Sequence, residues 1–265
     1  MDLATILGLI LGFVVVTVVM IMDGGSPAEL FAHPQAILLT VGGAITASMV
    51  SSSFNIVLSL PKFIIIAIKG HKANPIGAID SLTQMADKAR REGLLALEEE
   101  AKKITDPFLQ KGVMLVVDGV DPAQVRAILD LEIHHMRERH EKGINFFASA
   151  GGYAPTLGII GTVMGLVNVL KQLDEPSKLG ASIAAAFLAT LWGIMSANLL
   201  WLPLAGKLKA KSEEEAQYRR LLLEGILALQ AGENPRLVKE KLSAFLPPKS
   251  RPSEASAAKK AKAEA

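Results

Sequence analysis

The 265-residue chain contains no cysteine. Thiol catalysis, disulfide bonds and cysteine-based metal sites are therefore excluded. The chain also lacks an excess of charge of either sign, since 28 basic and 26 acidic side chains leave a formal net charge of +2. Because the basic residues are interspersed with acidic ones, we expect no nucleic acid as a partner.

Charged side chains are missing from four apolar stretches, and a bilayer-spanning helix needs about 20 such residues. No strand-like alternation of polar and apolar residues competes with a helical interpretation. The sequence therefore predicts an all-α polytopic membrane protein with four transmembrane helices and a helical cytoplasmic domain. The predicted spans are Leu3–Met22, Pro34–Val50, residues 146–170 and residues 181–205.

A further apolar stretch at residues 54–68 is interrupted by Pro61 and Lys62. We interpret it as the second span emerging into the inner membrane interface and not as a fifth crossing. Lys and Arg are absent from the connector at residues 23–33 but dense in residues 69–142 and after Gly206. By the positive-inside rule, both termini and the long middle segment are expected in the cytoplasm.

These assignments divide the chain into five parts. The first two spans and the interfacial extension occupy residues 1–68, and a cytoplasmic helical domain occupies residues 69–143. The last two spans follow at residues 144–206, and two short C-terminal cytoplasmic helices lie within residues 207–246. The low-complexity tail at residues 247–265 is expected to be disordered.

Four Asx-Pro pairs in the charged regions mark expected helix starts, because Asn or Asp caps a helix and Pro suits its first turn. They are Asn74-Pro75, Asp106-Pro107, Asp121-Pro122 and Asn234-Pro235. Helices are expected at residues 94–103, 124–141, 221–229 and 237–245.

No titratable residue lies deep in any predicted span, whereas ion carriers usually place one there. Either the protein moves no ions, or a partner chain supplies the carboxylate. The hydroxyls of Thr162 and Thr190 are present instead, both about 12–14 Å below the outer surface at a rise of 1.5 Å per residue. They could line a polar path, or each could bond to a carbonyl of its own helix.

The last two predicted spans contain small residues at regular spacing and one proline each. Gly158, Gly161 and Gly165 follow small-xxx-small spacing, which favours close helix packing either within one subunit or between subunits. Pro155 and Pro203 each remove a helical hydrogen bond and could act as hinges or as fixed kinks.

Charged runs flank Gly93, with Arg90, Arg91 and Glu92 before it and Glu98 to Glu100 after it. They form either an electrostatic docking patch or an ordinary solvated helix face. His134, His135 and His140 are spaced five and six residues apart, which does not place them on one helix face as metal ligands. We expect no metal site, no cofactor and no enzymatic activity, because no nucleophile–base set is present.

Several ordered motifs resemble those of the flagellar motor stator A subunit, the MotA/PomA family within the MotA/TolQ/ExbB proton channel group. The principal one is YAPTLGIIGTVMGLVNVL at residues 153–170. Others are MDLATILGLILG at 1–12, VGG at 41–43, ARREGLLALEE at 89–99, QKGVMLVVDG at 110–119 and AAFLATLWGIMSANLLWLPLAGKL at 185–208. The resemblance extends over residues 1–246.

This resemblance implies a ring of A subunits, a pentamer, around two MotB/PomB-type B subunits whose single membrane helix carries the essential Asp. Passage of H⁺ or Na⁺ past that Asp would turn the ring against the rotor protein FliG. Arg90 and Glu98 match the charged pair that meets FliG, and Pro155 and Pro203 match the prolines that couple ion flow to movement. Thr162 and Thr190 match hydroxyls of the sodium path in PomA-type members.

One departure leaves the choice of ion open: Gln35 occupies a position near the start of the second span where PomA-type members have Thr. Two other functions compete with the stator. A TolQ/ExbB-like energiser would drive a periplasmic partner, but members of that branch have three spans and the present chain has four predicted. A structural membrane scaffold would have no ion path at all.

Overall fold

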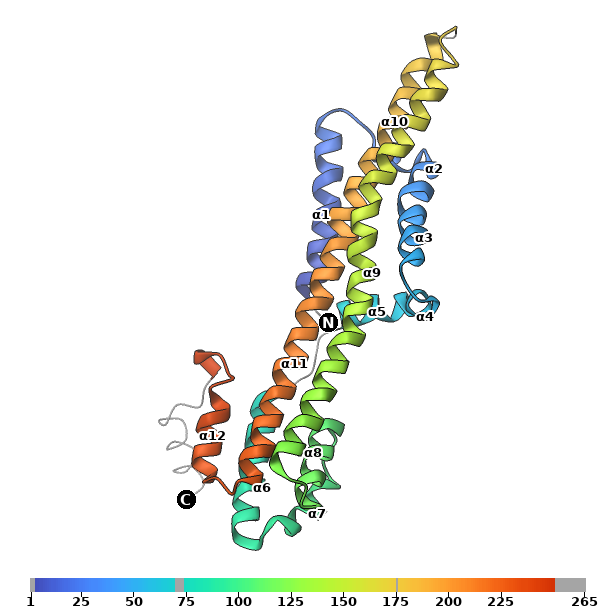
Figure 1. Ribbon diagram of the computed structural model, residues 1–265. Helices are drawn as coiled ribbons and strands as arrows, with labels where there is room; N and C mark the ends of the chain where they lie inside the picture. Colours follow the sequence, from blue (N-terminus) through green and yellow to red (C-terminus); the bar gives the residue numbers. More distant parts are fainter. Residues whose placement is uncertain (1–2, 70–73, 175, 251–265) are drawn as a thin grey trace. The chain divides into compact units, whose positions relative to one another are not determined.

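The computed structural model describes residues 3–69, 74–174 and 176–250, and every regular element in these ranges is helical (Figure 1). This confirms the predicted all-α fold. The chain divides into two compact units. We call Met1–His71 with Glu138–Ser212 the apolar unit, and Lys72–Arg137 with Glu213–Ala265 the charged unit.

Three helical segments are long and apolar enough to cross a membrane. They are α1 (Leu3–Met22), the apolar part of α9 (Pro122–Leu170), and the run Leu179–Gln230, which combines α10 (Pro176–Ser196), the π-helical turn η4 (Ala197–Trp201) and α11 (Leu202–Gln230). The predicted second span, Pro34–Val50, is apolar but shorter, and consists of α2 (Pro34–Ile37), the π-helical turn η2 (Leu38–Gly42) and α3 (Gly43–Val50). The structure is therefore consistent with four spans, of which three are long enough to cross a membrane as single continuous helices.

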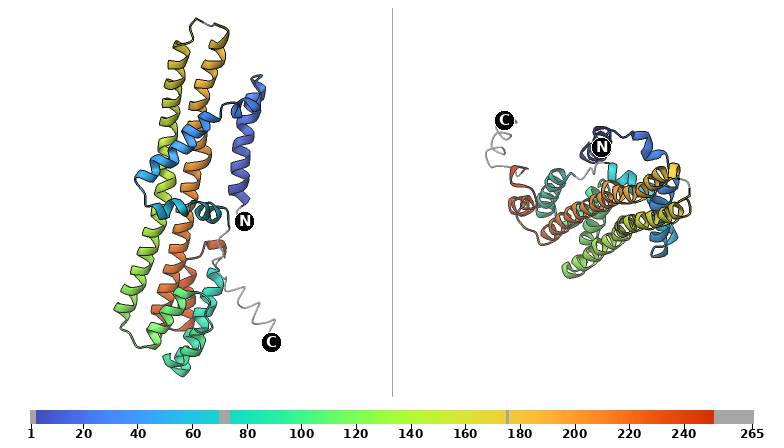
Figure 2. Two further views of the ribbon diagram at one scale, coloured as in Figure 1. Left: turned by 90° about the vertical axis from the view of Figure 1, so that its right-hand side faces the viewer. Right: turned by 90° about the horizontal axis from the view of Figure 1, so that it is seen from above.

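The segment after α3 does not form another crossing. It contains α4 (Phe54–Leu58) and the nine-residue α5 (Leu60–Ile68). Nine helical residues span only about 14 Å, less than half of a hydrocarbon core. Within the apolar unit, α5 lies crosswise to α1 and to the adjoining part of α9 (Figures 1 and 2). This geometry agrees with an interfacial segment.

Two expected breaks in the chain are wrong. The cytoplasmic helix predicted at residues 124–141 and the span predicted from residue 146 form the single helix α9. Gly143 lies inside this helix because the Phe63 ring fills the space where a side chain would be: a Cβ at Gly143 would lie 2.9 Å from Phe63 Cζ. The helix predicted at residues 221–229 is likewise the end of α11 and not a separate element.

All four Asx-Pro pairs start helices as predicted. Asn74 and Asp106 cap α6 (Pro75–Glu92) and α8 (Pro107–Val117) by accepting hydrogen bonds from the next backbone N–H groups. The caps of α9 and of α12 (Pro235–Ser243) follow the same scheme, with Asp121 Oδ1 2.9 Å from Ala123 N and Asn234 Oδ1 2.9 Å from Arg236 N.

The helix expected at residues 94–103 is only partly formed. Gly93 has a φ of +86°, which ends α6 and turns the chain. A 3₁₀ turn, η3 (Leu94–Leu97), and the short α7 (Glu98–Ala101) follow. Leu97 and Ala101 are fully buried in the core of the charged unit, so burial of these side chains determines the path of the segment.

The remaining elements are short. A 3₁₀ turn, η1 (Pro27–Phe31), connects α1 to α2, and Trp192 Nε1 on α10 donates a 2.7 Å hydrogen bond to the Leu30 carbonyl in that turn. At the C-terminal end, η5 (Pro248–Ser250) is a 3₁₀ turn within the tail that we expected to be disordered. Residues 251–265 of that tail lie outside the described residues.

Glycine and alanine bring α9 and α10 into backbone contact. A Cβ added at Gly193 would lie 2.6 Å from the Ala154 carbonyl oxygen, and one added at Gly158 would lie 2.8 Å from the Ala189 oxygen. At Gly165 the added Cβ would lie 2.5 Å from the Ala186 Cβ. The glycines of the small-xxx-small motif therefore pack within one chain.

We expect Gly158→Ala to destabilise the protein, because the added methyl group meets backbone atoms that cannot move aside. Overpacking of this kind costs about 1–3 kcal/mol, which exceeds the roughly 1 kcal/mol that alanine gains over glycine in a helix. Thermal unfolding of the purified full chain in detergent measures the effect. Gly152→Ala on the same helix is the control, because its Cβ would meet nothing within 4 Å; an equal melting temperature for both variants would contradict the close crossing.

Candidate functional site

The two span threonines meet in the structure. Thr162 on α9 and Thr190 on α10 have their hydroxyl oxygens 2.5 Å apart. Thr162 also lies 3.0 Å from the Ala186 carbonyl oxygen, and both hydroxyls lie within 3.3 Å of the Gly158 oxygen. The sequence left two alternatives, a shared polar path or bonds to each hydroxyl's own helix. The geometry contains elements of both, because Gly158 belongs to the helix of Thr162.

This cluster offers two hydroxyl and two carbonyl oxygens, which are hard ligands suited to an alkali cation or to water. All four oxygens are neutral, and the predicted spans on α9 and α10 contain no carboxylate. The cluster alone therefore cannot neutralise a cation at membrane depth.

The surface beside the threonines is apolar and uncovered. On α9 the side chains of Ile159, Val163 and Met164 are more than half exposed, and on α10 Phe187 and Ile194 are similarly open. An apolar surface of this kind on a water-soluble monomer would be unusual. Lipid or another protein chain must cover it in the membrane.

The segments around the two prolines lie against each other. Pro155 stands inside α9, so the carbonyl of Gly151, four residues earlier, has no helical N–H partner at that position. A Cβ at Gly151 would lie 2.5 Å from the Leu202 side chain, directly before Pro203. Pro203 in turn is the second residue of α11 and follows directly on the π-helical turn η4 and Leu202.

Beside Pro203, the apolar unit has a groove of about 550 Å³ between α1 and the start of α11. Ala4 and Gly8 line it on α1, and Gly206 and Ala210 line it on α11. Helix α11 therefore borders an open groove on the side that faces α1, directly after Pro203.

The charged residues around Gly93 form a hairpin, which we define as Asp87 to Lys103 and call the charged hairpin. Arg90 is exposed and makes no ion pair with any described residue. Glu98 is paired with Lys102 at 2.9 Å, and this pairing raises the pKa of Lys102. Arg90 and Glu98 do not contact each other, and both carry charges that face solvent.

One ion-pair cluster closes the charged hairpin. Glu100 accepts hydrogen bonds from Lys88 at 3.0 Å and from Lys103 at 3.3 Å. The Lys88 bond is the main reason why the pKa of Glu100 is lowered and that of Lys88 is raised. The sequence pattern does not indicate this pair, because residues 12 positions apart meet only through the turn at Gly93, and Glu100 is one member of an acidic run.

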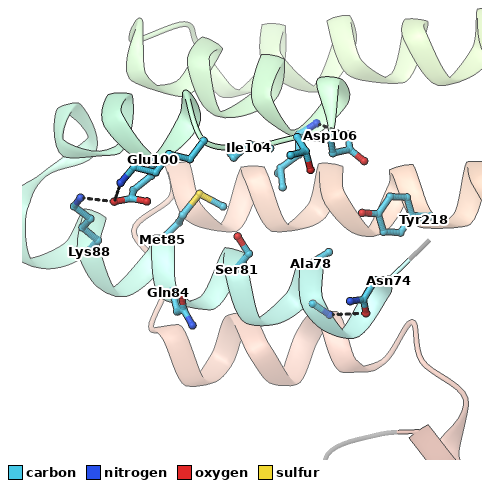
Figure 3. A pocket seen from close by; sticks show the side chains of 14 residues that line it. Asn74, Ala78, Ser81, Gln84, Met85, Lys88, Glu100, Ile104, Asp106 and Tyr218 are labelled. Atoms are coloured by element: carbon cyan, nitrogen blue, oxygen red, sulfur yellow. Dashed lines mark hydrogen bonds and ion pairs between the residues drawn. The ribbon is translucent and has the colours of Figure 1, made fainter. Parts of the chain in front are cut away.

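A cavity of about 510 Å³ lies behind the hairpin (Figure 3). Lys88 and Glu100 stand at one end of it, and Asn74, Asp106 and Tyr218 lie towards the other. Burial, followed by the negative charge of Asp106, raises the pKa of Tyr218. The charged hairpin thus borders a cavity lined partly by polar side chains, in addition to the buried core that holds Leu97 and Ala101.

The three histidines of α9 do not form one cluster. The His134 and His135 rings lie side by side with centroids 5.6 Å apart, while His140 Nδ1 is 3.0 Å from the Ser212 hydroxyl. Among the described residues, no group of three His, Asp or Glu side chains is placed to hold a metal ion.

Comparisons with known proteins agree with these features. The model of the MotA/TolQ/ExbB proton channel family matches residues 100–220. Motility protein A of Bacillus subtilis is 39% identical over 252 residues, which cover 95% of this chain and 93% of that protein. The chain belongs to this family, in its motility protein A branch. Chemotaxis protein PomA of Vibrio alginolyticus is also 39% identical, over 93% of this chain and 96% of its own length.

Solved structures extend the family assignment to the fold. The C. jejuni MotAB structure has a chain with a TM-score of 0.91 and 33% identity, covering 96% of this chain and all of that one. The flagellar MotAB stator complex of Bacillus subtilis gives a TM-score of 0.87 at 38% identity, covering 93% and 96%. The predicted resemblance to the MotA/PomA family is confirmed.

The lowered pKa of Glu100 predicts a pH dependence for this family member. A carboxylate with a depressed folded pKa contributes stability above its unfolded pKa, about 4.3, and loses it as the pH falls through the folded value. Glu100→Gln should therefore lower the melting temperature of the full chain at neutral pH, and the difference from wild type should vanish at acid pH.

The control is Glu99→Gln, which removes an exposed neighbouring carboxylate that makes no ion pair with any described residue. We expect its melting temperature to follow wild type at every pH. A constant gap between Glu100→Gln and wild type across the pH range would show that the Lys88 and Lys103 pairing does not stabilise the hairpin.

Proposed function

We propose that this chain is the ion-conducting A subunit of a bacterial flagellar stator, coupling H⁺ or Na⁺ entry to torque on the rotor. The carrying observation is the Thr162–Thr190 hydroxyl pair, which lies beside an uncovered apolar face in spans without a carboxylate. Membership in the motility protein A branch supports the same function. One charge crossing the membrane releases about 2.3 kcal/mol per 100 mV, which supplies the energy for movement.

The missing carboxylate identifies the partner. The similar solved structures are MotAB complexes, and we infer that a B subunit with a single membrane helix supplies an Asp to this chain. The exposed side chains of α9 and α10 beside the threonines are where that helix and neighbouring A subunits fit. A pentameric A ring, with both termini in the cytoplasm of a bacterial inner membrane, completes the assembly that we propose.

The charged hairpin is the proposed contact with the rotor protein FliG. Arg90 presents a guanidinium that forms no ion pair with any described residue, and the exposed Glu98–Lys102 pair is screened by solvent, so Glu98 can exchange its partner readily. Exposed charges at the edge of a protein–protein contact set its association rate and its register more than its affinity. That is appropriate for a contact that must form and break at each step of rotation.

An energiser of the three-span TolQ/ExbB type is less well supported, because the similarity to motility protein A covers 93% of that protein and 95% of this chain. A family of channel subunits also offers no precedent for an enzyme. The transported ion, H⁺ or Na⁺, is the cargo, and no cofactor is proposed.

Removing a hydroxyl tests the ion path. With the B subunit co-expressed in a strain that lacks its own stator, we expect Thr190→Val to reduce ion influx and swimming at least tenfold, since the oxygen cluster loses a ligand that valine cannot replace. Thr156→Val is the control, because Thr156 lies on the same helix as Thr162 and bonds only to Tyr153 O at 2.8 Å. Undiminished influx in Thr162→Val and Thr190→Val would refute the path.

Charge reversal tests the rotor contact separately. Arg90→Glu and Glu98→Lys should lower torque several-fold while ion influx stays at the wild-type level, because the hairpin lies outside the spans. Arg220→Glu, an exposed reversal on α11, is the matched control. Wild-type torque from Arg90→Ala/Glu98→Ala would remove the hairpin from the coupling mechanism.

A further inference from the structure

Two long stretches of the sequence carry cations without any acidic residue. No Asp or Glu lies between Glu29 and Asp80, a stretch in which Lys62 lies in the first turn of α5 and Lys69 follows its last residue. None lies between Glu175 and Glu213 either, and that stretch ends in the run KLKAK at residues 207–211.

The fold brings these two stretches together in the apolar unit. The Lys211 ammonium on α11 donates to the carbonyls of Ile66 and Lys69, and so holds the C-terminal end of α5. The middle of α5 rests on α9, where the Phe63 ring fills the space beside Gly143, next to Lys142. We call the lysines on α5, at its C-cap and on the adjoining parts of α9 and α11 the basic belt: Lys62, Lys69, Lys142, Lys209 and Lys211.

The basic belt carries an excess of positive charge. Within the described residues, Lys62, Lys69, Lys142 and Lys209 are exposed and form no ion pair. The acids at this level are Glu138 and Glu141 on α9, and Glu138 already has a partner. Two carboxylates beside five lysines leave a net positive surface.

Apolar side chains surround these cations. Phe54 and Leu58 on α4 are 66% exposed, and Ile64, Ile65 and Ile66 on α5 are 37–59% exposed. A short helix that lies crosswise to the spans, with bare apolar side chains and a lysine at each end, has the pattern of a helix that floats at the membrane interface (Figure 1). Its lysines can extend towards the headgroups while its isoleucines enter the acyl region.

We propose that α4, α5 and the basic belt form a binding surface for anionic phospholipid headgroups of the cytoplasmic leaflet. The lysines pair with the headgroup phosphates, and Phe54, Leu58 and Ile65 insert among the acyl chains. A lipid fits better than an acidic protein segment, because the cations and the exposed apolar side chains are interleaved on one crosswise element. The surface lies outside the threonine cluster and outside the charged hairpin.

This surface also reaches the helix that carries Pro203. Lys211 bonds the end of α5 to α11, the helix that begins with Leu202 and Pro203. Anionic lipid would therefore hold in place the element to which the post-proline helix is fixed. The lipid composition of the membrane would therefore affect how firmly α5 holds α11.

Lipid selectivity tests the proposal on the full chain in complex with its B subunit. The complex is placed in nanodiscs of phosphatidylcholine with or without phosphatidylglycerol, and native mass spectrometry measures the phosphatidylglycerol that stays bound. Each lysine near an anionic surface contributes about a factor of five in binding. Lys62→Gln/Lys69→Gln should therefore reduce the retained phosphatidylglycerol roughly tenfold or more.

Matched variants and a second probe separate the alternatives. Lys62→Arg/Lys69→Arg should retain phosphatidylglycerol as wild type does, and Lys171→Gln/Lys178→Gln, which removes the same charge elsewhere, should too. Equal retention in Lys62→Gln/Lys69→Gln and wild type would overturn the proposal. So would displacement of phosphatidylglycerol by inorganic phosphate, which would indicate a free-anion site.

Ion influx measured in parallel keeps this result apart from the proposed function. If wild-type complex conducts ions but shows no preference for phosphatidylglycerol, only the lipid surface is refuted. If it binds phosphatidylglycerol through Lys62 and Lys69 but conducts no ions, the lipid surface stands and the stator function fails.

Discussion

The close crossing of α9 and α10 is the constraint on which the candidate ion path depends. Gly158 and Gly193 leave room for the backbone of each helix to approach the other, and a side chain at either position would collide with main-chain atoms. Only at this separation can a hydroxyl on one helix reach a hydroxyl and a carbonyl on the other. The oxygen cluster therefore depends on the absence of side chains at Gly158 and Gly193.

The same crossing explains why the chain is incomplete by itself. Packing small residues inward leaves the large apolar side chains of both helices outward, where the structure provides nothing to cover them. The buried polar atoms are neutral, so the electrostatic cost of a cation must be met from outside the chain. The proposed function therefore assigns both a covering surface and an acid to the neighbours of this chain.

Local signals in the sequence predicted local structure well. The first span matches α1 residue for residue, and each Asx-Pro pair starts a helix, because caps depend on adjacent residues alone. The equal depth assigned to Thr162 and Thr190 was enough to anticipate that they lie at one level. The continuity of α9 was missed, because the charged residues 124–141 and the apolar residues 146–170 were interpreted as two separate helices. The Lys88–Glu100 pair was equally invisible, because its geometry depends on the turn at Gly93.

The prolines connect the crossing to the rest of the apolar unit. Pro155 lies between Ala154 and Gly158, and both of these residues contact Gly193 on α10. One turn earlier, Gly151 packs on Leu202 at the start of the proline-bearing helix α11. A shift of α9 at Pro155 would therefore alter the separation at the threonines and push against Leu202 at the same time. Close-packed contacts resist compression, so this packing connects the threonine crossing to the start of α11, which borders the groove beside Pro203.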